Sequence, residues 1–195
     1  MIDLLVVASK NPDKISEIES VLVTEGLVGE IVRGLTWDDI PETGTTLEEN
    51  ALLKARTVAA VTGLPALADD TGLEVVALGN RPGVDTAFFA GPQASYSDNV
   101  EKMLAVMKNV SDRRATFRSV LVVVWPDGRE LMAEGRLAGA VAVEMRGGFG
   151  FGYDPIFEVG DRTLGEMDAE EKNRISHRAS AIRELAERLR ERSLR

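Results

Sequence analysis

The chain has 195 residues, 44% hydrophobic and 28% charged, so it is long enough to bury a core and ordinary in composition for a globular protein. Its net charge of −9 disfavours polynucleotides and anionic membranes as partners, although local cations or a metal ion can still hold a small polyanion. The absence of cysteine excludes disulfides and cysteine nucleophiles. With neither a basic leader nor a long apolar run at the start, we expect a cytoplasmic protein that does not span a membrane.

The first predicted elements are a strand and a helix. Residues 4–8 form a short apolar run that is typical of a buried strand. Asn11 is a good N-cap, and apolar residues at helical spacing predict a helix over 12–25. Its N-terminus, beside Lys10 and Lys14, is suited to bind a phosphate, because free amides and the helix dipole favour negative charge. Solvated surface lysines are the alternative and, on this feature alone, the commoner one.

A second strand is predicted over 31–35, and a second helix follows it. Thr46 and Glu49 form a capping box that opens the helix, which continues to about residue 62. Gly63 then ends it.

Two adjacent carboxylates, Asp69 and Asp70, follow a predicted strand over 65–68. Carboxylates at the end of a buried strand are costly unless they bind something positive, and ligands gather at that end of α/β sheets. Magnesium prefers one or two carboxylates with water and phosphate oxygens, and Asp70 with Glu42 can supply the pair. An ordinary Asp-rich turn closed by Gly72 is the alternative.

The second half of the chain is also predicted to mix strands and helices. The expected strands cover 73–78, 115–125, 130–143 and 156–157; the expected helices run from a cap at Ser97 or Asp98 to about Lys108, and from 176–178 to the C-terminus. The turn at 126–128 makes 130–143 the antiparallel partner of the preceding strand. Neither repeats nor an interdomain linker interrupt the pattern.

Residues 147–155 are a loop in which four of nine residues are glycine. Glycines let a backbone approach a flat ligand closely, and the rings of Phe149, Phe151 and Tyr153 offer faces for stacking. This composition is typical of a loop that wraps a nucleobase. The alternative, equally weighted on this stretch alone, is a turn whose aromatic rings close the edge of the core.

His177 is the single histidine and stands between Ser176 and Arg178 at a predicted helix start. A lone histidine is more often a structural hydrogen-bonding group than a catalyst. Here, however, its neighbours are a capping serine and an arginine, at a place where anions bind.

Taken together, these motifs resemble the Ham1-like inosine triphosphate pyrophosphatases over nearly the whole chain. The matching segments occur in the family's order: 8–11 with Lys14, 42–44, 49–51 with 54–55, 68–73, 82–83, Gly148 or Gly150 through Pro155, and 171–172 with 176–178. Each motif is moderately specific, and their shared order makes a chance resemblance very improbable.

The resemblance implies an elongated α/β fold in which helices flank a long, mixed, twisted sheet. It implies one two-lobed domain over 1–195, with a nucleotide cleft between the lobes, in a homodimer. It also implies hydrolysis of ITP, dITP and XTP to the monophosphate and pyrophosphate with Mg²⁺. These activities suit the residues, since attack at the α-phosphorus needs charge neutralisation and a base that orients water.

The family's roles transfer onto matching positions of this sequence. Asp70 would bind Mg²⁺ with Glu42 and activate water, and Asp69 would support it. The triphosphate would be held by Ser9, Lys10, Asn11, Pro12, Asp13 and Lys14, with Lys172. Lys14 would also be catalytic, and Thr71 would contact the substrate. The base would be surrounded by Phe151, Gly152, Tyr153, Asp154, Lys172, His177 and Arg178. Hydrogen-bond donors in this group would favour a 6-oxo purine.

Two positions depart from the family's pattern. Lys10 stands where glycine is common, and Phe88 stands where arginine is common. Two other functions remain open at this point: a pyrophosphatase for modified pyrimidine nucleotides, and a nucleotide-binding sensor without catalysis. The joint presence of Glu42, Asp69 and Asp70 argues against the sensor.

Overall fold

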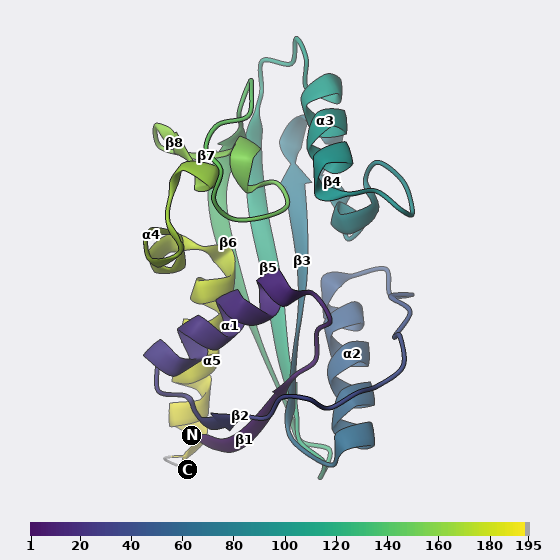
Figure 1. The fold of residues 1–195 in the computed structure, drawn as a ribbon, viewed down its shortest axis with the longest axis vertical. Coiled ribbons are helices and arrows are strands. Elements are labelled where there is room, and N and C mark those ends of the chain that lie inside the picture. The colour runs from purple at the N-terminus through teal and green to yellow at the C-terminus, as the bar shows by residue number, and fades with distance from the viewer. Residues whose placement is uncertain (194–195) are drawn as a thin grey trace. The chain divides into compact units, whose positions relative to one another are not determined.

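Strands and helices alternate along most of the computed structural model, which describes residues 1–193 (Figure 1). The strands are β1 Ile2–Val7, β2 Val28–Ile31, β3 Ala66–Val75, β4 Arg81–Gly83, β5 Arg114–Val124, β6 Glu130–Val141, β7 Phe157–Val159 and β8 Arg162–Thr163. The α-helices are α1 Pro12–Thr24, α2 Leu47–Thr62, α3 Tyr96–Val106, α4 Ala169–Ile175 and α5 His177–Ser193. The last two residues of the domain expected over 1–195 lie outside the described residues.

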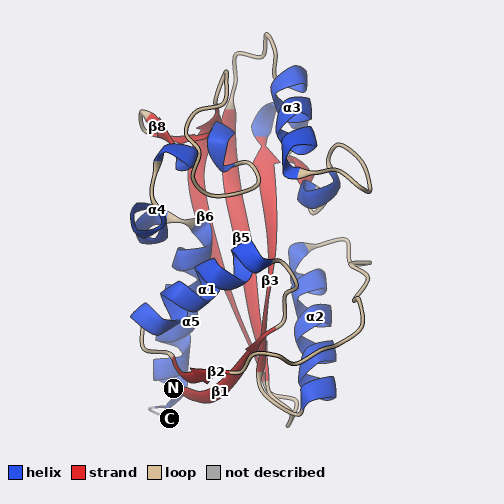
Figure 2. Ribbon diagram, viewed as in Figure 1, coloured by secondary structure: helices blue, strands red, loops and turns tan. Residues whose placement is uncertain are grey.

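The strands form one mixed sheet in the order β2-β1-β3-β5-β6-β7-β8, with β4 beside β3. β1 runs parallel to both β2 and β3, whereas β4 is antiparallel to β3, and β7 is antiparallel to β6 and β8. Helices flank this sheet (Figure 2). The predicted α/β fold with a long mixed sheet is therefore confirmed.

The chain divides into two compact units, and the strands β3, β5 and β6 contribute residues to both. Unit 1 comprises residues 1–70, 119–135 and the chain from 177 onward; unit 2 comprises 71–118 and 136–176. Within the described residues, no helix is long and apolar enough to cross a membrane.

Unit 1 has its own apolar core, which packs the helices α1 and α5 against the sheet. Leu5, Ile18, Leu67, Leu121 and Ile182 are all essentially inaccessible to solvent. α1 and α5 lie side by side on one side of β3, and α2 lies on the other (Figure 1). This arrangement gives each face of β3 in unit 1 a helical cover.

Unit 2 has a second core, which is richer in aromatic residues. Met103 of α3 and Leu73 of β3 are buried with Phe117, Tyr153 and Phe157. The rings of Phe117 and Phe157 are 4.5 Å apart between centroids, within the range of favourable aromatic pairs. Ala142, before the glycine-rich loop, and Phe157, after it, are buried in this core, so both flanking segments are fixed.

Local capping chemistry places the first two helices as predicted. The Asn11 side chain accepts hydrogen bonds from the amides of Asp13 and Lys14 at the start of α1. Thr46 accepts one from the Glu49 amide at the start of α2, and Gly63 ends α2 with φ +67°. The predicted capping box differs in its second bond, because the Glu49 carboxylate accepts from the Thr45 amide rather than from that of Thr46. Both helices thus begin and end where the sequence indicates.

The predicted bounds were wrong for the second strand, for the two strands around Asp69 and Asp70, and for the third helix. The second strand covers 28–31 rather than 31–35, because its register on the six-residue β1 pairs Ile2 with Val28 and Leu5 with Ile31. The strands predicted over 65–68 and 73–78 join through the residues between them into one strand, β3, which ends at Val75. The third helix is capped by Ser95, not by residue 97 or 98. Its true capping box uses Asp98 as the third helical residue.

Candidate active site

Asp69 lies within β3 in unit 1 and is almost completely buried. Lys14 of α1 places its Nζ 3.2 Å from Asp69 Oδ2. Arg178, in the first turn of α5, donates to the same oxygen from Nε at 3.3 Å and Nη2 at 3.2 Å. The guanidinium also donates from Nη1 to Glu17 of α1. Two helices thus direct cations to one carboxylate, which offsets the cost of burying it.

Asp70, the next residue of β3, is also buried but has different partners. Lys54 of α2 places its Nζ 2.8 Å from Asp70 Oδ1 and 2.9 Å from Glu42 Oε1. Asn50, one helical turn earlier, has its amide nitrogen 3.5 Å from Asp70 Oδ2. The side chains of Glu42, Asp69 and Asp70, with the cations that contact them, are called the acidic centre below.

The two neighbouring aspartates have pKa values displaced in opposite directions. Burial raises the pKa of Asp69, but the charges of Lys14 and Arg178 outweigh it and hold this pKa well below the ordinary value. For Asp70, burial raises the pKa and the Lys54 charge only partly opposes it, so the net shift is upward. Burial disfavours the charged form of Lys54, yet Asp70, Asp69 and Glu42 raise its pKa. Different environments therefore separate two chemically identical groups.

The predicted magnesium ligands, Glu42 and Asp70, both contact the same cation, the Lys54 ammonium. A hard divalent cation binds carboxylate oxygens, and these two carboxylates already converge on one positive group. The residues present therefore fit such an ion, with substrate oxygens and water completing its shell. The described residues contain no group of three or more His, Cys, Asp or Glu side chains arranged to hold a metal by themselves.

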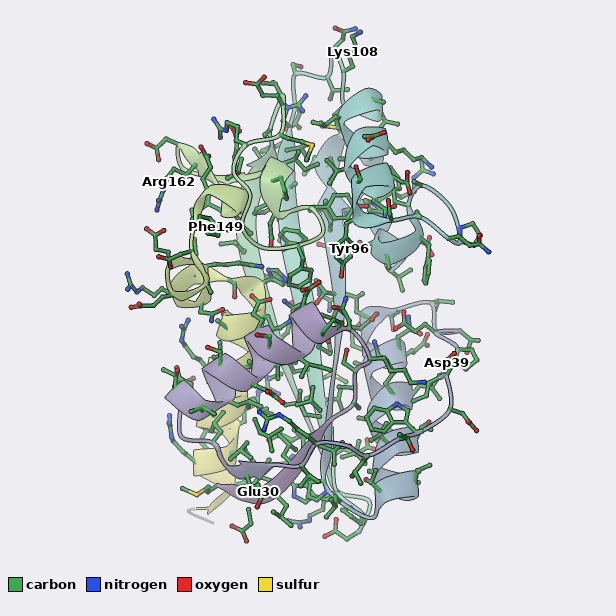
Figure 3. The ribbon with its side chains drawn as sticks, in the orientation of Figure 1. Glu30, Asp39, Tyr96, Lys108, Phe149 and Arg162 are labelled. Atoms are coloured by element: carbon green, nitrogen blue, oxygen red, sulfur yellow. The ribbon has the colours of Figure 1, made fainter. Side chains whose placement is uncertain are left out.

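The predicted phosphate segment at the start of α1 is already well hydrogen-bonded. The Asn11 oxygen satisfies two amides of the first turn, and the Asn11 amide itself donates to Ser9 Oγ at 3.2 Å. Lys10 forms a 2.5 Å ion pair with Asp39, on the loop beside α2 (Figure 3). Both lysines of this segment thus contact carboxylates, and Lys14 reaches the acidic centre. Pro12 and Asp13 occupy the first two helical positions.

The glycine-rich loop belongs to unit 2 and surrounds a second buried ion pair. Lys172 of α4 places its Nζ 2.6 Å from Asp154 Oδ2, which also accepts from the Phe151 amide at 2.8 Å. The same ammonium lies 4.6 Å from the centroid of the Phe151 ring. A Cβ on Gly150 would approach the Asp154 carboxylate to 2.1 Å, so this position requires glycine. Three residues expected around the base, Phe151, Asp154 and Lys172, thus lie together, whereas their ion pair was not predicted.

The three aromatic residues of the loop differ in how deeply they are buried. Tyr153 is buried in the unit 2 core and its hydroxyl donates to the Thr86 carbonyl oxygen at 3.0 Å. Its ring therefore closes the edge of the core, which is the alternative considered for the loop. Phe149 is 59% exposed and Phe151 is half-buried, 5.9 Å from the ring of Tyr96 (Figure 3). Burial raises the pKa of Tyr153 and keeps its hydroxyl neutral.

The remaining predicted residues fall in both units. Thr71 is a half-buried residue of β3, and Gly152 adopts φ +61° in the loop. His177 is buried at the first position of α5. A Cβ on Gly135 of β6 would come within 2.0 Å of the His177 carbonyl oxygen. The start of α5 thus packs directly on the strand backbone. Phe88, the second departure from the family pattern, is 51% exposed.

Three residues of the acidic centre and its surroundings escaped the sequence-based site prediction: Glu17, Asn50 and Lys54. Lys54 and Asn50 lie four residues apart on α2, the spacing that puts two side chains on one helix face. Both polar residues lie among the buried residues of α2, and a polar residue at such a position was the sequence signal that could have indicated a site. Glu17 lies three residues after Lys14, a spacing that also places both on one face of α1.

The fold and the acidic centre define the class: an α/β protein in which one strand of a mixed sheet carries two adjacent carboxylates, each compensated by cations from flanking helices. Comparison with known proteins identifies the family within this class. The model of the Ham1 family matches residues 5–188, and the chain belongs to that family.

Curated relatives and solved structures agree with this membership. The chain is 50% identical over 190 residues to a dITP/XTP pyrophosphatase of Symbiobacterium thermophilum, covering 95% of this chain and 94% of the relative. It is 42% identical over 192 residues to a dITP/XTP pyrophosphatase of Bacillus subtilis, covering 94% and 96%. The Staphylococcus aureus Ham1 protein has a similar structure, with a TM-score of 0.84, 36% identity, and coverage of 97% of this chain and all of that one.

Proposed function

We propose that this protein hydrolyses the deaminated purine nucleoside triphosphates ITP, dITP and XTP to monophosphate and pyrophosphate, and so removes them from the nucleotide pool. Membership of the Ham1 family and the named activity of full-length relatives support the reaction. The observation that carries the proposal is the acidic centre. Three cations from three helices, Lys14, Lys54 and Arg178, contact the two adjacent carboxylates of β3, and Lys54 also contacts Glu42.

Water attacks the α-phosphorus, and pyrophosphate leaves. Asp70 orients this water and accepts its proton. Its pKa is raised by burial, which makes it a better proton acceptor than Asp69, whose pKa is held low. Asp69 remains ionised and holds Lys14 and Arg178. Lys14 lies at the start of α1, where its positive charge and the helix dipole stabilise the negative charge of the phosphates.

Magnesium is the proposed cofactor, with Glu42 and Asp70 as its protein ligands. When bound, it neutralises charge on the phosphate oxygens and lowers the pKa of water. Lys54 contacts both carboxylates and holds them at one place. The triphosphate segment from Ser9 to Lys14 and the half-buried Thr71 stay predictions as substrate contacts.

The purine ring is proposed to bind at the glycine-rich loop. The Phe151 ring offers a stacking face, and the ammonium of Lys172 is held beside it by Asp154. A 6-oxo purine accepts hydrogen bonds where adenine donates, so a fixed cationic donor favours the oxo form. Arg178 makes its described contacts with Glu17 and Asp69; its role toward the base, and that of His177, stays a prediction.

The reaction can be tested in ¹⁸O-labelled water with ITP, dITP, XTP, ATP, GTP and dTTP, each with Mg²⁺ and with excess EDTA. We expect ITP, dITP and XTP to yield monophosphate that carries the label, together with unlabelled pyrophosphate, and EDTA to abolish turnover. Release of orthophosphate, or label in the pyrophosphate, would place the attack at another phosphorus. Preferential turnover of dTTP would favour a pyrimidine enzyme, and binding without turnover would favour a sensor.

A homodimer and a cytoplasmic location are also proposed. The first rests on the resemblance to the family, and the second on the lack of cysteine and of a membrane-spanning helix in the described chain. Light scattering on the purified protein measures the first; a monomer at micromolar concentration would contradict it. Cell fractionation measures the second.

A further inference from the structure

Asn50 is a buried polar residue on α2, with 1% of its surface exposed. Asparagine is a poor helix former, and a buried amide is costly unless it is hydrogen-bonded. Both the oxygen and the nitrogen of the Asn50 side-chain amide have partners. Its oxygen accepts from the Gly44 amide at 2.8 Å, and its nitrogen lies 3.5 Å from Asp70 Oδ2. One side chain therefore connects the end of a loop to a carboxylate of the acidic centre.

The loop held by Asn50 is the one that carries Glu42. Residues 32–46, between β2 and α2, form neither helix nor strand. At the end of this segment the backbone packs tightly on α2: a Cβ on Gly44 would lie 2.6 Å from the Asn50 oxygen and 2.7 Å from Glu49 Cβ. Glu49 also accepts from the Thr45 amide at 2.7 Å. Two consecutive loop amides are thus fixed to α2, only two residues after Glu42.

Asn50 and Lys54 act on the same pair of carboxylates in different ways. Lys54, one turn later on α2, donates charged hydrogen bonds to the side chains of Glu42 and Asp70 and makes no hydrogen bond to the loop backbone among the contacts described. Asn50 fixes the backbone by a directional hydrogen bond. A small divalent cation such as Mg²⁺ tolerates little error in the position of its oxygen ligands.

We propose that Asn50 is a positioning residue, which sets the Glu42 loop relative to Asp70 so that both carboxylates face one divalent cation. This inference rests on the proposed function only in naming that cation. Partners that orient metal ligands typically contribute about 10–100-fold to metal affinity. We therefore expect Asn50→Ala to weaken binding of a divalent cation by about that factor.

The chain offers a matched control in Asn99, a buried asparagine on α3 in unit 2. Its oxygen accepts from the Ala90 amide at 2.8 Å, and its nitrogen donates to the Ala87 carbonyl at 2.9 Å. Asn99 thus fixes a loop to a helix as Asn50 does, but contacts no carboxylate of the acidic centre. Asn99→Ala should lower the melting temperature without changing cation affinity.

The experiment measures Mn²⁺ binding, without nucleotide, from the loss of the free-ion electron paramagnetic resonance signal. Wild type, Asn50→Ala and Asn99→Ala are compared well below their melting temperatures. A shift of about 10-fold or more in Asn50→Ala alone supports the proposal. Overlapping isotherms for wild type and Asn50→Ala, or an equal shift in Asn99→Ala, would overturn it. If Asn50→Ala does not fold, Gly44→Ala disturbs the same hydrogen bond from the loop side and is expected to show the same loss.

Turnover of ITP by the same samples separates this inference from the proposed function. Wild type that binds Mn²⁺ but hydrolyses none of the purine triphosphates would refute the function and leave the role of Asn50 standing. Normal hydrolysis by wild type, with unchanged Mn²⁺ affinity in Asn50→Ala, would refute the role of Asn50 alone. Wild type that binds no Mn²⁺ would refute the inference.

Discussion

Replacing Lys172 by methionine removes one charge from a buried ion pair of unit 2 while keeping a side chain of similar length. The Lys172 side chain is 7% exposed and that of Asp154 is 3% exposed, and the two charged groups are 2.6 Å apart. In the variant, the Asp154 carboxylate retains the hydrogen bond from the Phe151 amide but loses its cation. The buried carboxylate then lacks the ammonium that balanced its charge.

The structure sets the size of the effect. Removing one partner of a buried ion pair typically costs about 3–5 kcal/mol in the free energy of unfolding. In a chain of this length, 1 kcal/mol changes the melting temperature by about 2–4 °C. Lys172→Met should therefore melt about 6–20 °C below wild type.

Scanning calorimetry on a double-mutant cycle isolates the pair. Asp154→Asn keeps an oxygen that can accept from the Phe151 amide, so Lys172→Met combined with Asp154→Asn leaves no buried charge. We expect the double variant to be more stable than Lys172→Met, with a coupling of about 2–3 kcal/mol. Lys102→Met is the matched control, because Lys102 also lies over an aromatic ring, that of Phe89, but is exposed and contacts a carbonyl oxygen.

A melting temperature of Lys172→Met within about 2 °C of wild type would refute the reasoning, since this is below the effect of 1 kcal/mol. The reasoning would also be refuted if the stability losses of the two single variants add up to that of the double variant within about 0.5 kcal/mol, because such additivity is the behaviour of sites that do not interact.

Three further predictions concern unit 1. Asp70→Asn should fold normally by circular dichroism yet lose about 10²–10⁴-fold in kcat, and near-normal turnover would exclude Asp70 as the base. Gly135→Ala should lose at least about 1–3 kcal/mol in urea unfolding, because its Cβ would overlap the His177 carbonyl; unchanged stability would contradict this packing. Asp69 has a lowered folded pKa, so its contribution to stability is complete above its unfolded pKa of about 3.9 and is lost as the pH falls toward the folded value. Unfolding free energy from pH 5 to pH 2 should therefore fall more steeply in wild type than in Asp69→Asn, and parallel curves would disprove it.

Helix boundaries were predictable because the chemistry that sets them is local. Asn11 caps amides two and three residues away, and Gly63 ends α2 through its own backbone conformation. Such signals need no knowledge of the fold. The cap of α3 was predicted at Ser97 or Asp98 and was wrong: Ser95 caps the helix, because Asp98 lies three residues after Ser95, at the reciprocal position of a capping box.

The candidate site was predictable in composition but not in its connections. The sequence indicates the acidic pair, the lysines and the glycine-rich loop. It does not indicate that Lys54 contacts Glu42 and Asp70, or that Arg178 contacts Asp69, 109 residues away. These contacts depend on which strands are neighbours, and long-range pairing leaves no local trace. Tyr153 was likewise ambiguous, since an aromatic ring in a loop serves a ligand or a core equally well.

The error about β3 has a functional consequence. In a turn, Asp69 and Asp70 could both point to one cation. In an extended strand, successive side chains point to opposite faces of the sheet, so the two carboxylates must meet different elements. Asp69 meets α1 and α5, and Asp70 meets α2. The strand thereby separates the roles: one carboxylate is held ionised by two cations, and the other remains available for chemistry with its pKa raised by burial. What sequence reasoning treated as a break in the strand is the feature that makes the two aspartates different.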